Sequence, residues 1–281
     1  MRDTLGPMST DRAAAEESWA ERVRAARAQV ERLREVEDPA DFYGPWAKRF
    51  ALDPFRTDDA ALGVLRSLVR DGDVWLDIGA GGGRYALPIA LSARRVIALD
   101  PSASMLEVLR TGMVEHGISN VDVVEGTWPT RDPIRADVAL MAHVGYDIET
   151  FAGAFLDAAE AAVERCVVIM RTSGAARINE VLWPAIHGEP RQAYPMLPEL
   201  LELLAARAVS PTVASVERGS WGYDSREQLL AAARRLLYLQ EGSAKDHELK
   251  RLIAERASER DGQWEVDWTP MRDGVVSWEC P

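Results

Sequence analysis

The sequence predicts an α/β protein built on a doubly wound, mostly parallel sheet. Two observations carry this prediction: short apolar strands alternate with helices between residues 74 and 171, and a glycine-rich turn follows the first strand. Near-continuous apolar strands that alternate with helices are typical of a parallel sheet covered on both faces. The 281 residues, 47% of them hydrophobic and 28% charged, are enough to bury a sizeable core.

Charge and composition narrow the range of partners. The formal net charge is −12, and an acidic protein gains little from counterion release on a polyanion, so the sequence argues against a nucleic-acid partner. No apolar run of 18 residues and no apolar segment near the N-terminus is present, which predicts no membrane span, no signal peptide and a cytoplasmic location. The two cysteines, Cys166 and Cys280, form neither a disulfide framework nor a metal cluster. The oligomeric state stays open.

Residues 1–70 are expected to form an N-terminal helical extension or cap. A long helix is expected from Asp11 to Glu37, because an apolar stripe recurs at steps of four and three; its members are Trp19, Val23, Ala26, Val30 and Leu33. We favour packing of this stripe on its own chain over a dimer seam, which needs three or four sustained heptads. An aromatic-rich connector follows over 41–56, and Phe50, Phe55 and Arg56 are candidates to close over a ligand site. Thr57 is the expected cap of the next helix, which ends near Arg70.

The elements after residue 70 follow the strand–helix alternation. Strands are expected at 74–78, 96–99, 121–124, 137–142 and 166–170, with helices over 84–93, 102–116 and 149–163. Right-handed crossovers then leave few topologies.

Beyond Arg171 the alternation stops. Residues 172–198 hold several prolines and glycines, which indicates an irregular excursion and not a helix. A helix over 199–207, a strand at 212–217 and helical sequence over 225–260 follow. A last strand is expected at 275–278, with 264–268 as a candidate partner.

The glycine turn is the segment richest in chemical information. Gly79, Gly81 and Gly83 follow a strand, where glycine lets a ligand approach the backbone. Asp100 ends the next strand, 23 residues after Asp77, and an acid there commonly accepts the ribose hydroxyls of an adenosine. A helix cap is the alternative for Asp100, and plain turn residues the alternative for the glycines. A dinucleotide fits poorly, because Arg84 replaces the third glycine and Asp77 would repel a pyrophosphate.

Four segments in order resemble the motifs of the class I S-adenosylmethionine-dependent methyltransferases. They are Val-Trp-Leu-Asp-Ile-Gly-Ala-Gly-Gly-Gly at 74–83, Val-Ile-Ala-Leu-Asp-Pro-Ser-Ala-Ser-Met-Leu at 96–106, Asn-Val-Asp-Val-Val-Glu-Gly-Thr-Trp-Pro at 120–129, and Ala-Asp-Val-Ala-Leu-Met-Ala-His-Val at 136–144. The resemblance implies a Rossmann-like, seven-stranded sheet, S-adenosylmethionine as cofactor and S-adenosylhomocysteine as product. The residues that it assigns to the cofactor are Asp77, Gly79, Ala80, Gly81, Gly83, Asp100, Pro101, Met105, Gly126, Thr127, Trp128 and His143.

Two departures from the family pattern bear on the substrate. Thr127 stands where many members carry an acid for the adenine amino group, so adenine recognition is expected to rest on backbone groups and on Trp128, for which core packing is an equal alternative. The fourth motif lacks the Asn/Asp-Pro-Pro-Tyr/Phe signature of enzymes that methylate base amines, which argues again against nucleic acid.

The methyl acceptor is expected beyond the fourth and fifth strands. His143 and Tyr146 are the catalytic candidates there; His143 is either a base for a hydroxyl acceptor or a side chain that pins its loop. The excursion supplies the candidate acceptor wall: Trp183, His187, Arg191 and Tyr194. No metal site, Ser-His-Asp arrangement or P-loop spacing is found.

The sequence therefore predicts a methyltransferase that acts on a small molecule. The alternatives are a protein or RNA methyltransferase and a catalytically silent cofactor-binding module. A methyltransferase domain is expected over 71–281, with its cofactor half at 71–171 and substrate-side insertions at 172–210 and 225–262. The identity of the acceptor, and whether oxygen, nitrogen or carbon is methylated, stay open.

Overall fold

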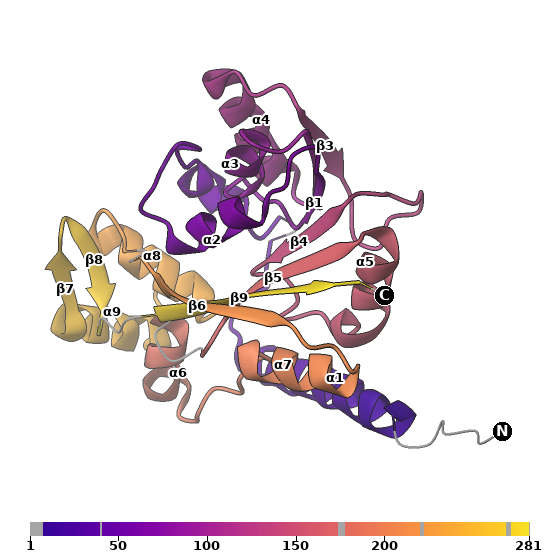
Figure 1. Cartoon of the computed structure of the whole chain (residues 1–281). Helices are drawn as coiled ribbons and strands as arrows, with labels where there is room; N and C mark the ends of the chain where they lie inside the picture. The colour runs from indigo at the N-terminus through magenta and orange to yellow at the C-terminus, as the bar shows by residue number, and fades with distance from the viewer. Residues whose placement is uncertain (1–7, 40, 174–177, 220–221, 268–270, 281) are drawn as a thin grey trace.

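A seven-stranded sheet forms the centre of the computed structural model, which describes residues 8–39, 41–173, 178–219, 222–267 and 271–280 (Figure 1). Its strand order is β3-β2-β1-β4-β5-β9-β6, and β9 runs in the direction opposite to the other six strands. The predicted mostly parallel α/β sheet is therefore confirmed. The strands are β1 (Val74–Ile78), β2 (Arg95–Asp100), β3 (Val121–Glu125), β4 (Val138–Ala142), β5 (Arg165–Arg171), β6 (Thr212–Arg218) and β9 (Met271–Glu279).

Helices cover both faces of this sheet (Figure 1). Alternation along the strands sends Trp75 and Ala98 into one core layer, and Leu76 and Leu99 into the other. The first layer is covered by α2 (Ala60–Leu68), α3 (Ala86–Ala90) and α4 (Ala103–His116). The second is covered by α1 (Met8–Leu33), α5 (Leu156–Ala162) and α7 (Leu197–Ala206), with the π-helical turn η2 (Phe151–Phe155) leading into α5.

The apolar stripe of α1 packs on its own chain. Trp19, Val23, Ala26 and Val30 are each at most 6% exposed. The Trp19 indole stacks on Phe151 with ring centroids 4.9 Å apart, and its Nε1 donates to the Ile148 carbonyl at 3.1 Å. The prediction of own-chain packing is confirmed for these positions.

A smaller helical cluster lies beside the end of β6 and the start of β9 (Figure 1). It buries a core of its own that also takes in Val30, from the far end of α1. α1 therefore contacts both the sheet core and this cluster. We call the following elements the helical cluster: α6 (Ile178–His187), α8 (Arg226–Leu236), α9 (Ala244–Arg256) and the hairpin β7 (Ala257–Arg260) and β8 (Gln263–Val266).

The expectation of an irregular excursion over 172–198 is wrong for α6. This helix includes Pro184, which lies on its exposed side, while Leu182, Trp183 and Ile186 are buried in the helical cluster. Burial of three large side chains outweighs the cost of one proline in the last turn. Residues 174–177 lie outside the described part of the chain.

Three smaller expectations also need correction. β8 pairs with β7, while β9 pairs with β5 and β6, so the expected pairing of 275–278 with 264–268 is wrong; Trp268 lies outside the described residues. The helical run expected at 225–260 is divided between α8 and α9 by a turn in which Gly242 has φ +81°, and its last four residues form the strand β7 instead. Asp59, not Thr57, caps α2, because its carboxylate accepts from the Leu62 N–H at 3.1 Å.

Among the described residues, no helix is both long enough and apolar enough to cross a membrane.

Candidate active site

The glycine turn between β1 and α3 is built for close backbone approach. Gly79, Gly81 and Gly83 have φ of +79°, +53° and +84°, a region that L side chains rarely adopt. A Cβ on Gly79 would lie 2.4 Å from a methyl group of Val144, in the loop after β4. The turn and the β4 loop therefore touch, which places the predicted cofactor side and the predicted acceptor side next to each other.

Asp100 ties this turn to the end of β2. One of its carboxylate oxygens accepts from the Gly81 N–H at 2.9 Å, and the other accepts from the Ser102 N–H at 2.8 Å. The cap of α4 is Ser102, whose hydroxyl accepts from the Met105 N–H, so the alternative role of Asp100 as the helix cap is wrong. Burial raises the pKa of Asp100. Each carboxylate oxygen keeps a further lone pair for a ligand hydroxyl.

Asp77 is a buried acid whose Oδ1 has no hydrogen-bond partner within the described chain. Burial, and then repulsion by Asp100, raise the pKa of Asp77 to about 7. A ligand that brings positive charge to the turn would stabilise the ionised form of this group. The orphaned oxygen and the glycine cradle fit S-adenosylmethionine, which carries an ammonium and a sulfonium.

The remaining residues predicted for the cofactor surround the ends of β2 and β3. The Gly126 N–H donates to the Asp100 carbonyl at 3.1 Å, and Thr127 is exposed. Trp128 packs against the sheet core, and its indole Nε1 donates to the Phe155 carbonyl at 3.1 Å, so core packing is at least one of its roles. Two others lie at the start of α4, Met105 buried and Pro101 exposed.

Residues 41–50, which we call the strap, cover the glycine turn. The Asp41 carboxylate accepts from the hydroxyls of Ser102 and Ser104, the latter at 2.6 Å. The strap ends in the 3-10 helix η1 (Gly44–Phe50), and a Cβ on Gly82 would lie 2.9 Å from the Cβ of Phe50. Phe50 therefore reaches the turn as expected. Two other candidates do not cover it in this way: Phe55 is exposed beside His116, and Arg56 donates to the Arg84 carbonyl.

His143 and Tyr146 meet in the loop after β4. His143 has the unusual φ of +59°, and its backbone N–H donates to the Ile169 carbonyl at 2.8 Å. Its Nδ1 lies 3.2 Å from the Tyr146 hydroxyl, which also accepts from the Arg171 N–H at 2.9 Å. The structure thus joins the two predicted catalytic residues to the end of β5.

The other ring nitrogen of His143 faces two residues that sequence reasoning missed. Nε2 lies 3.5 Å from Oδ2 of Asp273 on β9 and 3.4 Å from Nη1 of Arg218, the last residue of β6. No local motif marks either residue, because both reach the site only through the insertion of β9 between β5 and β6. Only the order of the strands in the sheet indicates that these two residues lie near His143.

Comparison with known proteins now adds to this geometry. Residues 76–170 match the family model described as a methyltransferase domain. The chain is 31% identical over 160 residues to the ribosomal RNA small subunit methyltransferase G of Synechococcus elongatus, a match that covers 54% of this chain and 57% of that protein. The chain thus spans little more than half the length of this relative.

Over residues 76–170 the chain is thus similar to methyltransferase domains, in agreement with the predicted family resemblance.

Solved structures agree on the fold of this domain. The S-adenosylmethionine-dependent methyltransferase from Thiobacillus denitrificans, solved with S-adenosylhomocysteine, aligns with a TM-score of 0.51 at 17% identity over 88% of this chain and all of that one. The YcgJ protein of Bacillus subtilis aligns with the same TM-score at 16% identity, over 78% of this chain and 97% of that one. At these identities the likeness supports the fold alone.

The side chains of the predicted acceptor wall are grouped mainly inside the helical cluster. The Arg191 guanidinium lies 4.1 Å from the Trp183 ring centroid and pairs with Glu180 at 3.2 Å. Trp183 is fully buried, whereas Tyr194 packs against the edge of the sheet core. Burial, and then Lys245, lower the pKa of His187 to about 4, which keeps this ring neutral at pH 7. Contact of these side chains with an acceptor stays a prediction.

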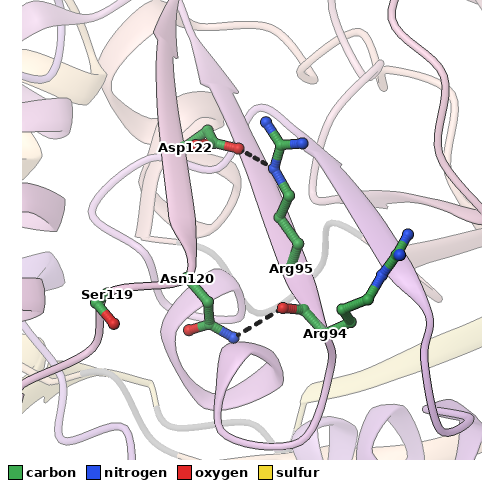
Figure 2. A pocket seen from close by; sticks show the side chains of 5 residues that line it. All are labelled: Arg94, Arg95, Ser119, Asn120 and Asp122. Carbon is green, nitrogen blue, oxygen red and sulfur yellow. Dashed lines mark hydrogen bonds and ion pairs between the residues drawn. The ribbon is translucent and has the colours of Figure 1, made fainter.

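A shallow depression of about 390 Å³ lies at the opposite edge of the sheet (Figure 2). Arg95 and Asp122, at the amino ends of β2 and β3, form an ion pair there, and the Asn120 amide donates to the Arg94 carbonyl. These polar groups bond to one another. The depression is therefore separate from the cofactor turn, which lies at the carboxyl ends of the strands.

Proposed function

We propose that the protein transfers the methyl group of S-adenosylmethionine to a small molecule bound at the carboxyl ends of β4, β5 and β6. The observation that carries this proposal is the covered polar cluster around His143. The side chains of His143, Arg218 and Asp273 are 19%, 15% and 3% exposed. A site this enclosed favours an acceptor that can enter it whole.

The cofactor half assigns separate tasks to its two acids. Asp100 accepts the ribose hydroxyls while holding the glycine turn in place, and Asp77 complements the positive charge of the methionine part. When bound, the cofactor supplies an electrophilic methyl carbon. The contribution of the protein is then chiefly alignment of the acceptor in line with that carbon.

His143 and Tyr146 can manage the acceptor proton. Nδ1 of His143 is within hydrogen-bond reach of the Tyr146 hydroxyl, and Nε2 faces the Asp273 carboxylate. With its Nε2 proton directed at Asp273, the ring keeps a basic Nδ1 toward Tyr146. The proton of a hydroxyl acceptor can then pass to the Tyr146 oxygen as the tyrosine proton passes to Nδ1. We therefore propose the pair as catalytic, with Asp273 as the residue that positions the ring.

The helical cluster is proposed as the acceptor-side part of a methyltransferase domain over 71–281, through insertions at 172–210 and 225–262, with 71–171 as the cofactor half. Residues 1–70 are proposed as the extension that covers this domain, because the strap reaches the glycine turn and α1 contacts both cores.

Ribosomal RNA is the second candidate acceptor, because the curated relatives are named as ribosomal RNA methyltransferases. The charge of this chain argues for the small molecule. Residues 222–266, which include α8, α9 and the β7–β8 hairpin of the helical cluster, contain eight Lys and Arg and nine Asp and Glu. The formal net charge of the whole chain is −12. RNA binding gains most of its affinity from basic surface, which this balance does not supply.

The assay that tests the proposal uses the full chain and methyl-labelled S-adenosylmethionine. Three acceptor pools are offered separately: a small-molecule cell extract, small ribosomal subunits, and a denatured protein extract. We expect label in the small-molecule pool. Label in ribosomal RNA establishes the second candidate, and the absence of label from every pool, with S-adenosylhomocysteine still bound in calorimetry, indicates a silent module. Calorimetry with NAD serves as the control, and we expect no binding.

A further inference from the structure

Arg171, at the end of β5, is a half-buried cation next to the proposed catalytic pair. Its guanidinium carbon lies 4.6 Å from the centroid of the Tyr146 ring. Its Nε is buried and has no hydrogen-bond partner in the described chain, where its guanidinium also forms no ion pair. The segments outside the described residues contain a single acidic side chain, Asp3.

The acid opposite Arg171 in the sheet is shared with a second arginine. The β5–β9 register places Arg171 opposite Asp273, and Nη1 of Arg218 lies 3.9 Å from Oδ2 of the same carboxylate. Burial lowers the pKa of Arg218; Asp273 opposes this effect, and Arg171 adds to it. Two guanidiniums therefore lie close to one carboxylate.

Arg84, the next guanidinium nearby, does not change this balance. It pairs with Asp59 at 2.8 Å, and Asp59 also holds Arg56 at 3.1 Å. Asp59 is therefore already held by two arginines.

We infer that the methyl acceptor carries an anionic group, a carboxylate or a phosphate, that binds Arg171 together with Arg218. This inference rests on the proposed function, since it takes the covered cluster as the acceptor site. Planar guanidiniums match both anions through paired N–H donors. The anion would complete the hydrogen bonding of Arg171 and balance the charge that Asp273 alone leaves in excess.

Binding of small anions to the protein saturated with S-adenosylhomocysteine tests this inference without turnover. Thermal unfolding is followed in sodium acetate, in sodium phosphate and in sodium chloride at equal ionic strength. We expect acetate or phosphate at about ten times its Kd to raise the unfolding midpoint by roughly 2–5 °C over chloride. The acetate arm identifies a carboxylate site, and the phosphate arm a phosphate site.

Variants decide whether the anion binds at this cluster. Arg171→Gln should weaken binding of that anion roughly 10- to 100-fold, the expected loss of a charged hydrogen bond. Arg272→Gln is the matched control, because Arg272 neighbours Asp273 on β9 but is exposed beside Ser215 and Glu217. Asp273→Asn should strengthen anion binding, since it removes the competing carboxylate, and this arm is informative even where Arg171→Gln folds poorly.

The inference is overturned when neither anion stabilises the protein more than chloride, or when stabilisation is the same in wild type and Arg171→Gln. Loss of S-adenosylhomocysteine affinity in Arg171→Gln also overturns it, because the arginine then serves the cofactor. Failure of the proposed function gives a different result: anions bind through Arg171, but no acceptor pool in the methyl-transfer assay becomes labelled.

Discussion

The carboxyl edge of the central sheet has an acidic half and a basic half. At the ends of β1 and β2, Asp77 and Asp100 lie beside the glycine turn and are buried, with exposed fractions of 2% and 8%. At the ends of β5 and β6, Arg171 and Arg218 lie around Asp273. One edge therefore presents negative charge beside the glycine turn and positive charge at the proposed acceptor site. Such an edge can hold two ligands of opposite charge side by side, because each ligand is attracted to one half and repelled by the other.

The largest effect is expected at the border of the two halves. His143→Ala should lower kcat by roughly 10²–10⁴, the usual contribution of a general base. An unchanged S-adenosylhomocysteine affinity would place the ring in the acceptor half, whereas a loss of affinity would support the cofactor contact that the family resemblance assigns to His143. His143→Gln separates the roles: recovery of most activity indicates orientation of the acceptor, and wild-type kcat in both variants leaves His143 as a loop anchor only.

In the acidic half, we expect Asp77 to lower the stability of the protein and to strengthen its binding of the cofactor. Its pKa in the folded protein is about 7, against an ordinary 3.8. Below about pH 4 the carboxyl is protonated in both the folded and the unfolded protein and does not affect stability. As the pH rises from 4 to 7, the unfolded protein loses this proton first, so the free energy of unfolding falls. Above pH 7 the loss of stability is complete and stays constant. Asp77→Asn should therefore be more stable than wild type at pH 8, by on the order of 2–4 kcal/mol, yet bind S-adenosylhomocysteine more weakly.

Urea unfolding of both proteins at pH 5 and pH 8 measures this trade. The stability difference should grow with pH. A difference that stays constant, or a variant less stable at pH 8, shows that Asp77 is not a strained acid in the folded protein.

The second acid should affect cofactor binding while the protein stays folded. Asp100→Ala removes hydrogen bonds to a charged group and should cost about 1.5–3 kcal/mol, or roughly 10- to 100-fold in S-adenosylhomocysteine affinity. Calorimetry supplies the Kd, and circular dichroism verifies the fold. An unchanged Kd would mean that Asp100 only ties the turn to β2, and the acidic half would then rest on Asp77.

The smallest effect tests the strap. Gly82→Ala places a methyl group against Phe50 and should push η1 outward, which we expect to raise the dissociation rate of S-adenosylhomocysteine a few-fold. Gly63→Ala is the control, since nothing lies within 4 Å of its added Cβ, and it should leave that rate unchanged. Equal rates in wild type and Gly82→Ala would show that the strap does not gate the acidic half.

The acidic half could be read from the sequence because its signals are local. The apolar strands, the glycine turn and Asp100 all fall within residues 74–100, and β1 begins and ends where the sequence predicts. Each signal depends on neighbours in the chain, so alternation and turn chemistry suffice.

The basic half could not be read in the same way. Asp273 and Arg218 enter the site through pairings between strands far apart in the sequence, which no local pattern encodes. α6 was missed for a related reason: the burial of Trp183 among distant helices, and not local propensity, decides that the chain is helical at Pro184.

The position of β9 has a consequence for how the molecule assembles. This strand comes last in the sequence, yet it lies between β5 and β6. Until residues 271–279 have been synthesised, β5 presents an unpaired edge and β6 has no partner in the sheet. The basic half of the edge therefore forms only when the sheet is completed, whereas β1 to β4 can pair earlier. A shortened chain that ends before Met271 would retain the glycine turn and Asp100, but it would lack Asp273 and would expose a strand edge prone to aggregation.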